Sequence, residues 1–237
     1  MKKIVKLNRS VIPSCDVSSL SLLKTLVKET TNIKGTGAYK IGFQLALAFG
    51  FSKVIDAIRK YSSLPIIYDH QKAGNDIPEM GKRFAEACKD VNAVILFPFT
   101  GPTSEREWIR AVKNQELGII VGGEMTHKNF LESEDGFIRY DAPDDIYSIA
   151  ADEGVNNFVV PGNKPEKIMQ YKLLLEKKGI KNPVFYSPGF ITQGGNVTDA
   201  VKAAGTNYHA IVGRAIYEAK DIAKATEEIV KQLAFSK

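Results

Sequence analysis

The segment IIYDHQKAGNDIPEMG, residues 66–81, places two acids and a lysine directly after a short apolar run. Asp69, Lys72 and Asp76 stand where a strand should end and burial should stop. Acidic and basic groups brought together in a partly desolvated site form an alternating charge network. Such a network is costly unless it is fully paired, and chemistry is a common reason for keeping one. The structural alternative is a strand-end salt bridge before a helix whose first turn carries Asp76 and Glu79.

These charged residues can come together only if the strands that carry them end on the same side of a sheet. The hydrophobic pattern predicts such strands. Short apolar runs alternate with segments of helical spacing along the whole chain. This alternation is typical of a parallel sheet covered by helices, and eight units in this length predict an α/β fold of the (β/α)8 TIM-barrel class. The expected strands are residues 10–16, 38–44, 64–70, 93–99, 118–125, 157–162, 183–190 and 209–217. The expected helices are residues 18–32, 49–63, 77–90, 103–115, 144–154, 165–179, 196–205 and 219–235.

The competing fold is an open doubly wound sheet, which typically carries a glycine-rich turn after its first strand. PSCDVSS (residues 13–19) occupies that turn, and the sequence contains no G-x-G-x-x-G, so the barrel is favoured. In a barrel, the residues that act on ligands stand at the carboxyl ends of the strands. Asp16, Lys40 and Asp69 then converge on one mouth. Taken singly, Asp16 could cap the following helix, and Lys40 could be a strand residue that reaches solvent.

Two fragments near the C-terminus indicate an anion site. TQGG (residues 192–195) supplies an amide side chain and glycines whose N–H groups can approach an anion closely. VGRAI (residues 212–216) places Gly213 before Arg214 at the end of the last strand. A phosphate site after strands seven and eight recurs in these barrels, and arginine binds phosphate through paired hydrogen bonds. Together the fragments predict a phosphorylated ligand.

Composition narrows the class of protein. A chain of 237 residues that is 44% hydrophobic can build one large core, so we expect a single domain over residues 1–237. The net charge of +5 is dispersed, which indicates a solvated surface and no nucleic-acid partner. Cys15 and Cys88 lack metal-ligand spacing, and no apolar run has signal-peptide or membrane-spanning length. We therefore expect a soluble cytoplasmic protein without a membrane partner.

Several fragments, taken in order, resemble the orotidine 5'-phosphate decarboxylase family. They are YKIG (39–42), YDHQKAGNDIPE (68–79), GEMTH (123–127), SPGFITQGG (187–195) and AIVGRAIY (210–217). GEMTH and the combination of PGxxxQGG with VGRxIY are the more specific parts, whereas related phosphate-binding barrels share the lysine–aspartate cluster. The resemblance runs from Asp16 to Tyr217. It implies a lyase that decarboxylates orotidine 5'-phosphate to uridine 5'-phosphate in de novo pyrimidine biosynthesis, with no metal or organic cofactor.

The resemblance also implies residue roles. Lys40, Asp69, Lys72 and Asp76 would form a catalytic lysine–aspartate network in which Lys72 donates the proton. Asp76 would reach the neighbouring subunit's site, so a homodimer is expected. The implied substrate-binding residues are Asp16 at the ribose, Thr126 and Pro188 at the pyrimidine, and Gln193, Gly213 and Arg214 at the phosphate. Ile77 is also expected to bind substrate, with no part of the substrate assigned to it.

The sequence departs from the family pattern around Lys72. The family usually has D-x-K-x-x-D, whereas Asp69, Lys72 and Asp76 read D-x-x-K-x-x-x-D. Alternate residues of a strand share a face, so a regular strand would point Lys72 away from the face of Asp69. If the strand ended early or carried a bulge near His70 and Gln71, the Lys72 side chain could point to the same side as Asp69. Met80 also stands where the family often has threonine.

Two other functions fit the same pattern. One is a magnesium-dependent sugar-phosphate decarboxylase or aldolase-type lyase whose metal could be held by Glu124 and Asp69, although the flanking lysines argue against it. The other is a non-catalytic barrel that binds a phosphate or a nucleotide, which only the spacing around Lys72 favours. His127 and His209 are expected to be hydrogen-bonded structural residues, because neither stands beside an obvious nucleophile.

Overall fold

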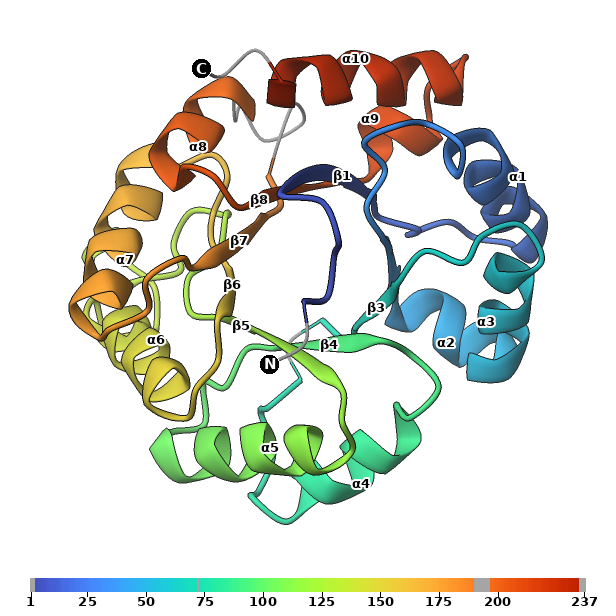
Figure 1. Cartoon of the computed structure of the whole chain (residues 1–237). Helices are drawn as coiled ribbons and strands as arrows, with labels where there is room; N and C mark the ends of the chain where they lie inside the picture. Colours follow the sequence, from blue (N-terminus) through green and yellow to red (C-terminus); the bar gives the residue numbers. More distant parts are fainter. Residues whose placement is uncertain (1–2, 72, 190–196, 235–237) are drawn as a thin grey trace.

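The computed structural model describes residues 3–71, 73–189 and 197–234, and within them eight parallel strands form one barrel. The strands pair in the order β1-β8-β7-β6-β5-β4-β3-β2, and Figure 1 shows them as a ring inside a layer of helices. The strands are β1 Arg9–Pro13, β2 Tyr39–Gly42, β3 Ile66–Asp69, β4 Ala93–Leu96, β5 Gly118–Gly122, β6 Asn157–Val159, β7 Val184–Ser187 and β8 Tyr208–Val212. The (β/α)8 barrel expected from the sequence is therefore confirmed.

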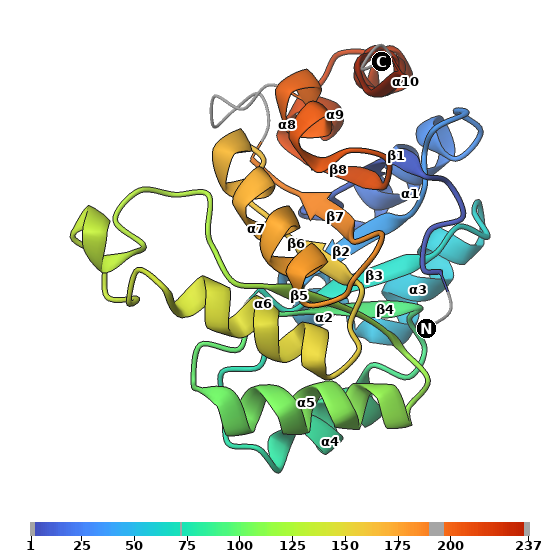
Figure 2. The same cartoon turned by 60° about the vertical axis from the view of Figure 1, so that its left-hand side comes forward.

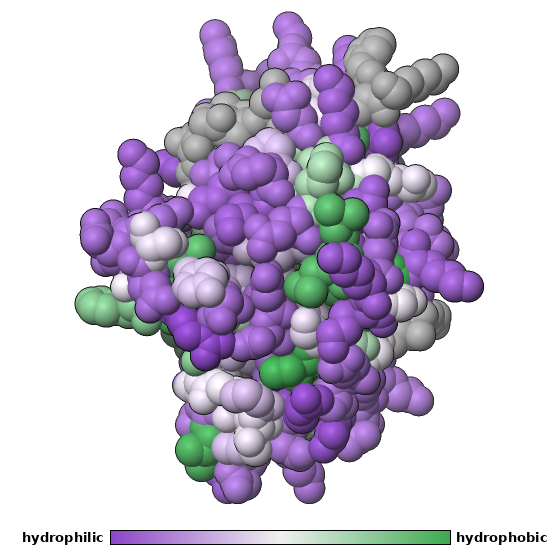
Figure 3. Space-filling view, turned by 90° about the vertical axis from the view of Figure 1, so that its left-hand side faces the viewer, coloured by the Kyte–Doolittle hydropathy of each residue, from purple (hydrophilic) through white to green (hydrophobic). Residues whose placement is uncertain are grey.

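Helices connect the strands and cover the outside of the ring (Figure 1). They are α1 Leu20–Thr30, α2 Phe43–Phe49, α3 Phe51–Arg59, α4 Met80–Ala87, α5 Pro102–Asn114, α6 Ala142–Asp152, α7 Pro165–Lys177, α8 Val197–Ala204, α9 Arg214–Tyr217 and α10 Ile222–Ala234, with a 3-10 turn η1 at Glu132–Glu134. The long connection between β5 and α6 stands away from the barrel (Figure 2). Figure 3 shows that the side formed by α6, α7 and α8 is mostly hydrophilic, with separate hydrophobic residues. Among the described helices, none has both the length and the apolar character needed to cross a membrane.

Alternate strand residues face opposite sides of the sheet and so build two packed layers. On β4, Val94 and Leu96 join the cluster that contains the buried helix residues, while Ala93 and Ile95 join a second cluster. The second cluster collects inward-facing residues from the strands around the ring and therefore fills the barrel interior. Val5 belongs to it, so the segment before β1 closes the amino-terminal end of the ring (Figure 1).

The ring closes between β1 and β2 through isolated contacts. Parallel bridges join Val11 to Thr36 and Ser14 to Lys40, and the Cys15 N–H donates to the Lys40 carbonyl at 2.7 Å. β1 pairs on its other side with β8 over its whole length. The carboxyl ends of β1 and β2 are thereby held next to each other, with Lys40 at their junction.

Two of the predicted strands end earlier than expected, because a short helix begins directly after each of them. Residues 214–217 were expected to continue the last strand, but they form α9 after Gly213. Residues 43 and 44 were expected to extend the second strand, but they begin α2, which the sequence did not predict. In both places an apolar run continues beyond the glycine that ends the strand, so hydrophobicity alone could not separate strand from helix.

Candidate active site

The centre of the candidate site is Lys40, a charged residue inside the barrel. Lys40 is only 4% exposed, and its Nζ lies 3.3 Å from Asp69 Oδ2 and 3.4 Å from Asp16 Oδ1. Burial by itself would lower the pKa of Lys40, but Asp69 and then Asp16 raise it above its ordinary value. The ammonium group is therefore held in its charged form between two carboxylates.

Asp16 faces the barrel mouth and does not cap a helix. Its Oδ2 accepts a hydrogen bond from Ser14 Oγ at 2.6 Å. The N-cap of α1 is Ser19, whose hydroxyl accepts from the Leu22 N–H, so the alternative reading of Asp16 as the cap is wrong. Gly42 leaves room for this arrangement, because a Cβ at that position would lie 2.7 Å from Asp16 Oδ1.

A cavity of about 310 Å³ opens at the carboxyl ends of the strands around these charges. The predicted residues that line it are Asp16, Lys40, Asp69, Thr126, Pro188, Gly213 and Arg214. The structure thus brings the carboxylate–lysine cluster and the predicted anion-binding arginine to one cavity. Sequence reasoning missed Ser14, Phe97, Met125 and Tyr217, which also line it. Ser14 could have been found, because it stands two residues before Asp16 and so shares its face.

The chain leaves β3 at once after Asp69. Asp69 Oδ1 accepts a hydrogen bond from the Gln71 N–H at 2.8 Å, and Gln71 adopts the left-handed conformation with φ of 55°. This is the early strand exit that the long spacing required. His70 is exposed and forms a hydrogen bond with the Tyr68 hydroxyl, so its side chain turns away from the cavity. Lys72 itself lies outside the described residues.

Asp76 and Ile77 do not line the cavity of their own chain. Asp76 is exposed, and Ile77 is 59% exposed. Their backbone is nevertheless fixed against α5, because Ser104 Oγ donates to the Asp76 carbonyl at 3.0 Å and Trp108 Nε1 donates to the Ile77 carbonyl at 3.2 Å. A single chain therefore presents these two side chains outward from a fixed backbone.

The predicted anion side of the cavity is formed by the junction of β8 and α9. Gly213 follows β8, and Arg214 begins α9 at the cavity wall. A Cβ at Gly213 would lie 3.3 Å from Tyr217 Cε1, so glycine allows the chain to pass close to that ring. Gln193, which was assigned to the same end of the site, belongs to residues 190–196 and lies outside the described residues.

Glu124 is engaged by protein groups and is not a free ligand for a metal. Lys164 Nζ donates to its Oε1 at 2.8 Å, and the Tyr171 hydroxyl donates to its Oε2. Within the described part of the chain, no group of three or more His, Cys, Asp or Glu side chains is arranged to hold a metal ion. A magnesium lyase would need Glu124 and Asp69 as metal ligands, but both carboxylate oxygens of Glu124 already accept hydrogen bonds from the protein.

His209 is a hydrogen-bonded structural residue, as expected, whereas His127 is exposed. His209 is fully buried, its Nδ1 lies 2.8 Å from Ser10 Oγ, and burial lowers its pKa to about 3, with a smaller contribution from Lys3. It therefore stays neutral inside the barrel. The ring of His127 packs edge-on against Phe130, with ring centres 5.8 Å apart.

The sequence matches the profile of the "Orotidine 5'-phosphate decarboxylase / HUMPS family" over residues 9–229. A protein named orotidine 5'-phosphate decarboxylase from Pyrococcus abyssi is 32% identical over 197 residues, which cover 82% of this chain and 85% of that relative. One of the same name from Methanosphaera stadtmanae is 29% identical over 231 residues, which cover 97% of this chain and 99% of that relative.

Solved structures show the same architecture. Orotidine 5'-phosphate decarboxylase from Pyrococcus horikoshii has a TM-score of 0.76 at 27% identity, covering 94% of this chain and 99% of that chain. The Methanocaldococcus jannaschii enzyme complexed with inhibitor BMP has a TM-score of 0.82 at 24% identity, covering 95% and 98%, and supports the fold. Neither a magnesium-dependent lyase nor a non-catalytic barrel gains support from these relatives. The chain belongs to the orotidine 5'-phosphate decarboxylase / HUMPS family.

Proposed function

We propose that this protein decarboxylates orotidine 5'-phosphate to uridine 5'-phosphate, the carboxy-lyase step of de novo pyrimidine biosynthesis, without a metal or an organic cofactor. The observation that carries the proposal is the buried Lys40, held between Asp16 and Asp69 in a cavity that Arg214 also lines. Fixed charges at one end and an anion-binding side chain in the same cavity suit a phosphorylated substrate that develops charge as it reacts.

The reaction needs an environment that favours a carbanion over a carboxylate. Loss of CO2 from C6 of the pyrimidine leaves a carbanion with little delocalisation, so fixed positive charge must stabilise it. Asp69 would lie near the substrate carboxylate and favour the state in which that negative charge has left. We assign Lys72 as the group that stabilises and then protonates C6, on the basis of the family motif. Lys40 would hold Asp69 in place and balance its charge.

The remaining assignments describe binding. Asp16 would contact the ribose, Thr126 and Pro188 the pyrimidine, and Gly213 and Arg214 the phosphate, with Gln193 assigned to the phosphate on the motif alone. The support for the first five is that they line the same cavity. Binding energy from the phosphate, which is remote from C6, would help to hold the ring in its reactive position.

We further infer a homodimer in which Asp76 and Ile77 complete the neighbouring subunit's site. This proposal is supported by their exposure and by the hydrogen bonds that fix their carbonyl groups to α5. We also propose a cytoplasmic location, for which the support is that Cys15 and Cys88 are both free thiols.

The decisive experiment follows the loss of orotidine 5'-phosphate absorbance with purified protein in excess chelator, beside the variant Lys72→Ala. We expect turnover by the wild type and its loss in the variant. Turnover that needs added magnesium would contradict the metal-free reaction. No turnover of this substrate, together with turnover of a sugar phosphate in magnesium, would favour the metal-dependent lyase. Substrate binding without turnover would favour the non-catalytic barrel and overturn the proposal.

A further inference from the structure

The segment after β5 brings a buried carboxylate to the wall of the cavity. Glu124, Met125 and Thr126 all line the cavity, and the side chain of Glu124 is 0% exposed. A buried carboxylate is costly unless charged and hydrogen-bonding partners replace the water that it has lost. The Glu124 side chain therefore depends on its partners, Lys164 and Tyr171, for its place beside the cavity.

Lys164 holds two parts of the β5–α6 connection at once. Besides its 2.8 Å contact with Glu124, its Nζ lies 3.3 Å from Oε1 of Glu134, in η1 of the same connection. Burial alone would lower the pKa of Lys164, but Glu124 and then Glu134 raise it, so the ammonium group stays charged. Figure 2 shows that this connection stands away from the barrel, and Lys164 ties it back to the start of α7.

The two residues before Lys164 donate hydrogen bonds to two residues that line the cavity. Asn163 Nδ2 donates to the Thr126 carbonyl at 3.0 Å, and the Gly162 N–H donates to the Pro188 carbonyl at 2.9 Å. Thr126 and Pro188 are the two residues proposed to contact the base. We call residues 162–164 the support segment.

We infer that the support segment, and Lys164 above all, is a positioning element for the pyrimidine. Lys164 does not line the cavity, so it acts through Glu124 and the neighbouring Thr126. This inference rests on the proposed function, because it takes the base to lie against Thr126 and Pro188. The support segment supplies hydrogen bonds and charge to the base end of the site, whereas the phosphate end is formed by β8 and α9.

The charge pair gives the inference a distinctive test. In Lys164→Met, the buried Glu124 loses its counter-charge and a hydrogen-bond donor, so we expect the segment that carries Glu124 and Thr126 to shift. The double variant Glu124→Gln/Lys164→Met contains neither charge, so it should recover part of the activity that Lys164→Met loses. Lys164→Arg keeps the charge and should recover more than Lys164→Met. Lys178→Met is the matched control, because Lys178 stands at the other end of α7 and pairs with Asp152 at 3.1 Å.

The experiment measures turnover of orotidine 5'-phosphate and binding of two probes, uridine 5'-phosphate and ribose 5-phosphate. For Lys164→Met we expect kcat/KM to fall about 10- to 100-fold, as displacement of a substrate-positioning group by a fraction of an ångström to an ångström would produce. Affinity for uridine 5'-phosphate should fall, while affinity for ribose 5-phosphate, which lacks the base, should stay unchanged. Lys178→Met should match the wild type in every measurement.

Equal weakening of both probes, or an unchanged kcat/KM, would overturn the inference. If Lys164→Met does not fold, Asn163→Ala takes its place, since that variant removes the hydrogen bond that the Asn163 side chain donates to the Thr126 carbonyl. If the wild type binds uridine 5'-phosphate but shows no turnover, the proposed function fails while the selective loss of that probe still supports the inference. A wild type that does not bind uridine 5'-phosphate overturns both.

Discussion

Lys40 Nζ lies 3.3 Å from Asp69 Oδ2, and the two residues come from neighbouring parallel strands, β2 and β3. The strand register places Asp69 opposite Gly42, two residues beyond Lys40, so the long lysine side chain reaches along the strand to the carboxylate. Asp16 completes the arrangement from β1's side of the ring. Residues on β2, on β3 and just after β1 therefore share one ion cluster around the buried Lys40.

Replacing Lys40 by methionine should abolish most activity. The change leaves the Asp16 and Asp69 carboxylates without their shared counter-charge, so both lose their fixed positions. We expect kcat/KM for orotidine 5'-phosphate to fall about 100-fold or more, the size of effect seen when one preorganised electrostatic group is removed. The assay is the absorbance loss of the substrate, with circular dichroism as the check of folding. Lys53→Met, on the exposed face of α3, serves as the control. Activity near that of the control would contradict the role of Lys40.

Glu105 should make the protein less stable as the pH rises. It is 1% exposed on α5, its Oε1 has no hydrogen-bond partner among the described residues, and burial raises its pKa to about 9 against the opposing effect of Arg106. Between pH 5 and 9 the folded protein keeps a proton that the unfolded chain has released. This group alone therefore lowers the free energy of unfolding by about 1.4 kcal/mol per pH unit in that range.

The measurement is urea unfolding of the wild type and Glu105→Gln at several pH values from 5 to 8. Glutamine does not titrate, so the stability of the variant relative to the wild type should increase steadily with pH. Glu107→Gln, at an exposed position on the same helix, should show no such trend. A pH-independent difference for Glu105→Gln would show that the carboxyl group is already ionised in the folded protein.

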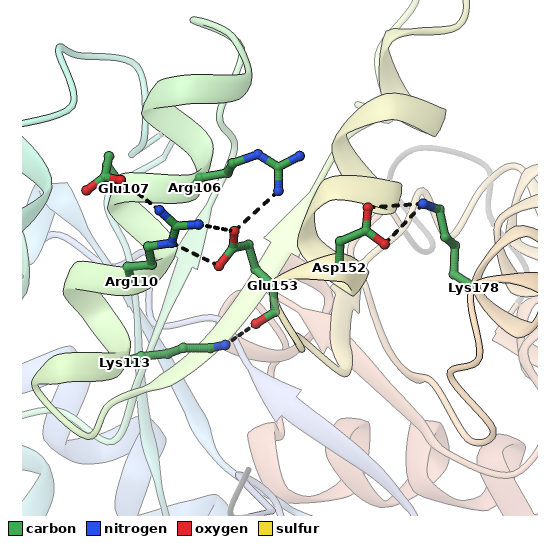
Figure 4. Close-up of polar contacts among 7 residues, drawn as sticks. All are labelled: Arg106, Glu107, Arg110, Lys113, Asp152, Glu153 and Lys178. Carbon is green, nitrogen blue, oxygen red and sulfur yellow. Dashed lines mark hydrogen bonds and ion pairs between the residues drawn. The ribbon is translucent and has the colours of Figure 1, made fainter.

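Glu153 should stabilise the contact between α5 and α6. Its carboxylate accepts from Arg106 at 3.2 Å and from Arg110 at 2.8 Å, and its carbonyl accepts from Lys113 (Figure 4). The hydrogen bonds from Arg110 lower the pKa of Glu153. A depressed pKa contributes stability above the ordinary value of 4.5, and this contribution disappears as the pH falls through the folded pKa.

We expect Glu153→Gln to cost about 1 kcal/mol of unfolding free energy at pH 7 in low salt, since such pairs lie near the surface. The cost should shrink in high salt because mobile ions screen the arginines. Asp152→Asn, which affects the neighbouring pair with Lys178 (Figure 4), should cost less. Urea titrations at two salt concentrations test this, and a cost that is the same in both salts would argue against an electrostatic origin.

The proposed dimer predicts complementation between two inactive variants. Asp76→Asn and Lys72→Ala should each lose activity alone. If Asp76 serves the neighbouring subunit, a mixed dimer carries one site with both changes and one intact site. Random assembly at equal amounts should then restore about a quarter of wild-type activity, because half of the dimers are mixed and each has one intact site. The mixture is unfolded and refolded together before assay, and absence of recovery would place Asp76 and Lys72 in the same site.

The sequence predicted the strands well because their burial leaves a simple signal. Runs such as residues 93–99 and 118–125 are nearly continuous in apolar residues, as expected where helices cover the outside and side chains fill the inside. Asp16, Lys40 and Asp69 could be placed at one mouth because parallel strands end at the same side. The helix α2 was missed, since its apolar residues follow β2 directly and Leu47, within it, is exposed.

The partners of Glu124 could not be predicted in the same way. Lys164 and Tyr171 are more than one strand–helix unit away in sequence, and nothing in the local pattern of either residue marks it as a partner of a buried acid. Such pairs depend on side-chain packing between β5 and α7, which the hydrophobic period does not encode. The orientation of His70, toward Tyr68, is a further detail set by packing.

The pairing of β1 with β8 has a consequence for synthesis of the protein. Lys40 and Asp69 are both made in the first third of the chain, yet β1 finds its full partner only when residues 208–212 have emerged. Until then one edge of the first strand is open, and the arginine that lines the cavity has not been made. A ribosome-bound fragment that lacks the last strand therefore cannot assemble the complete pocket, and nucleotide binding would report on whether a chain has been finished.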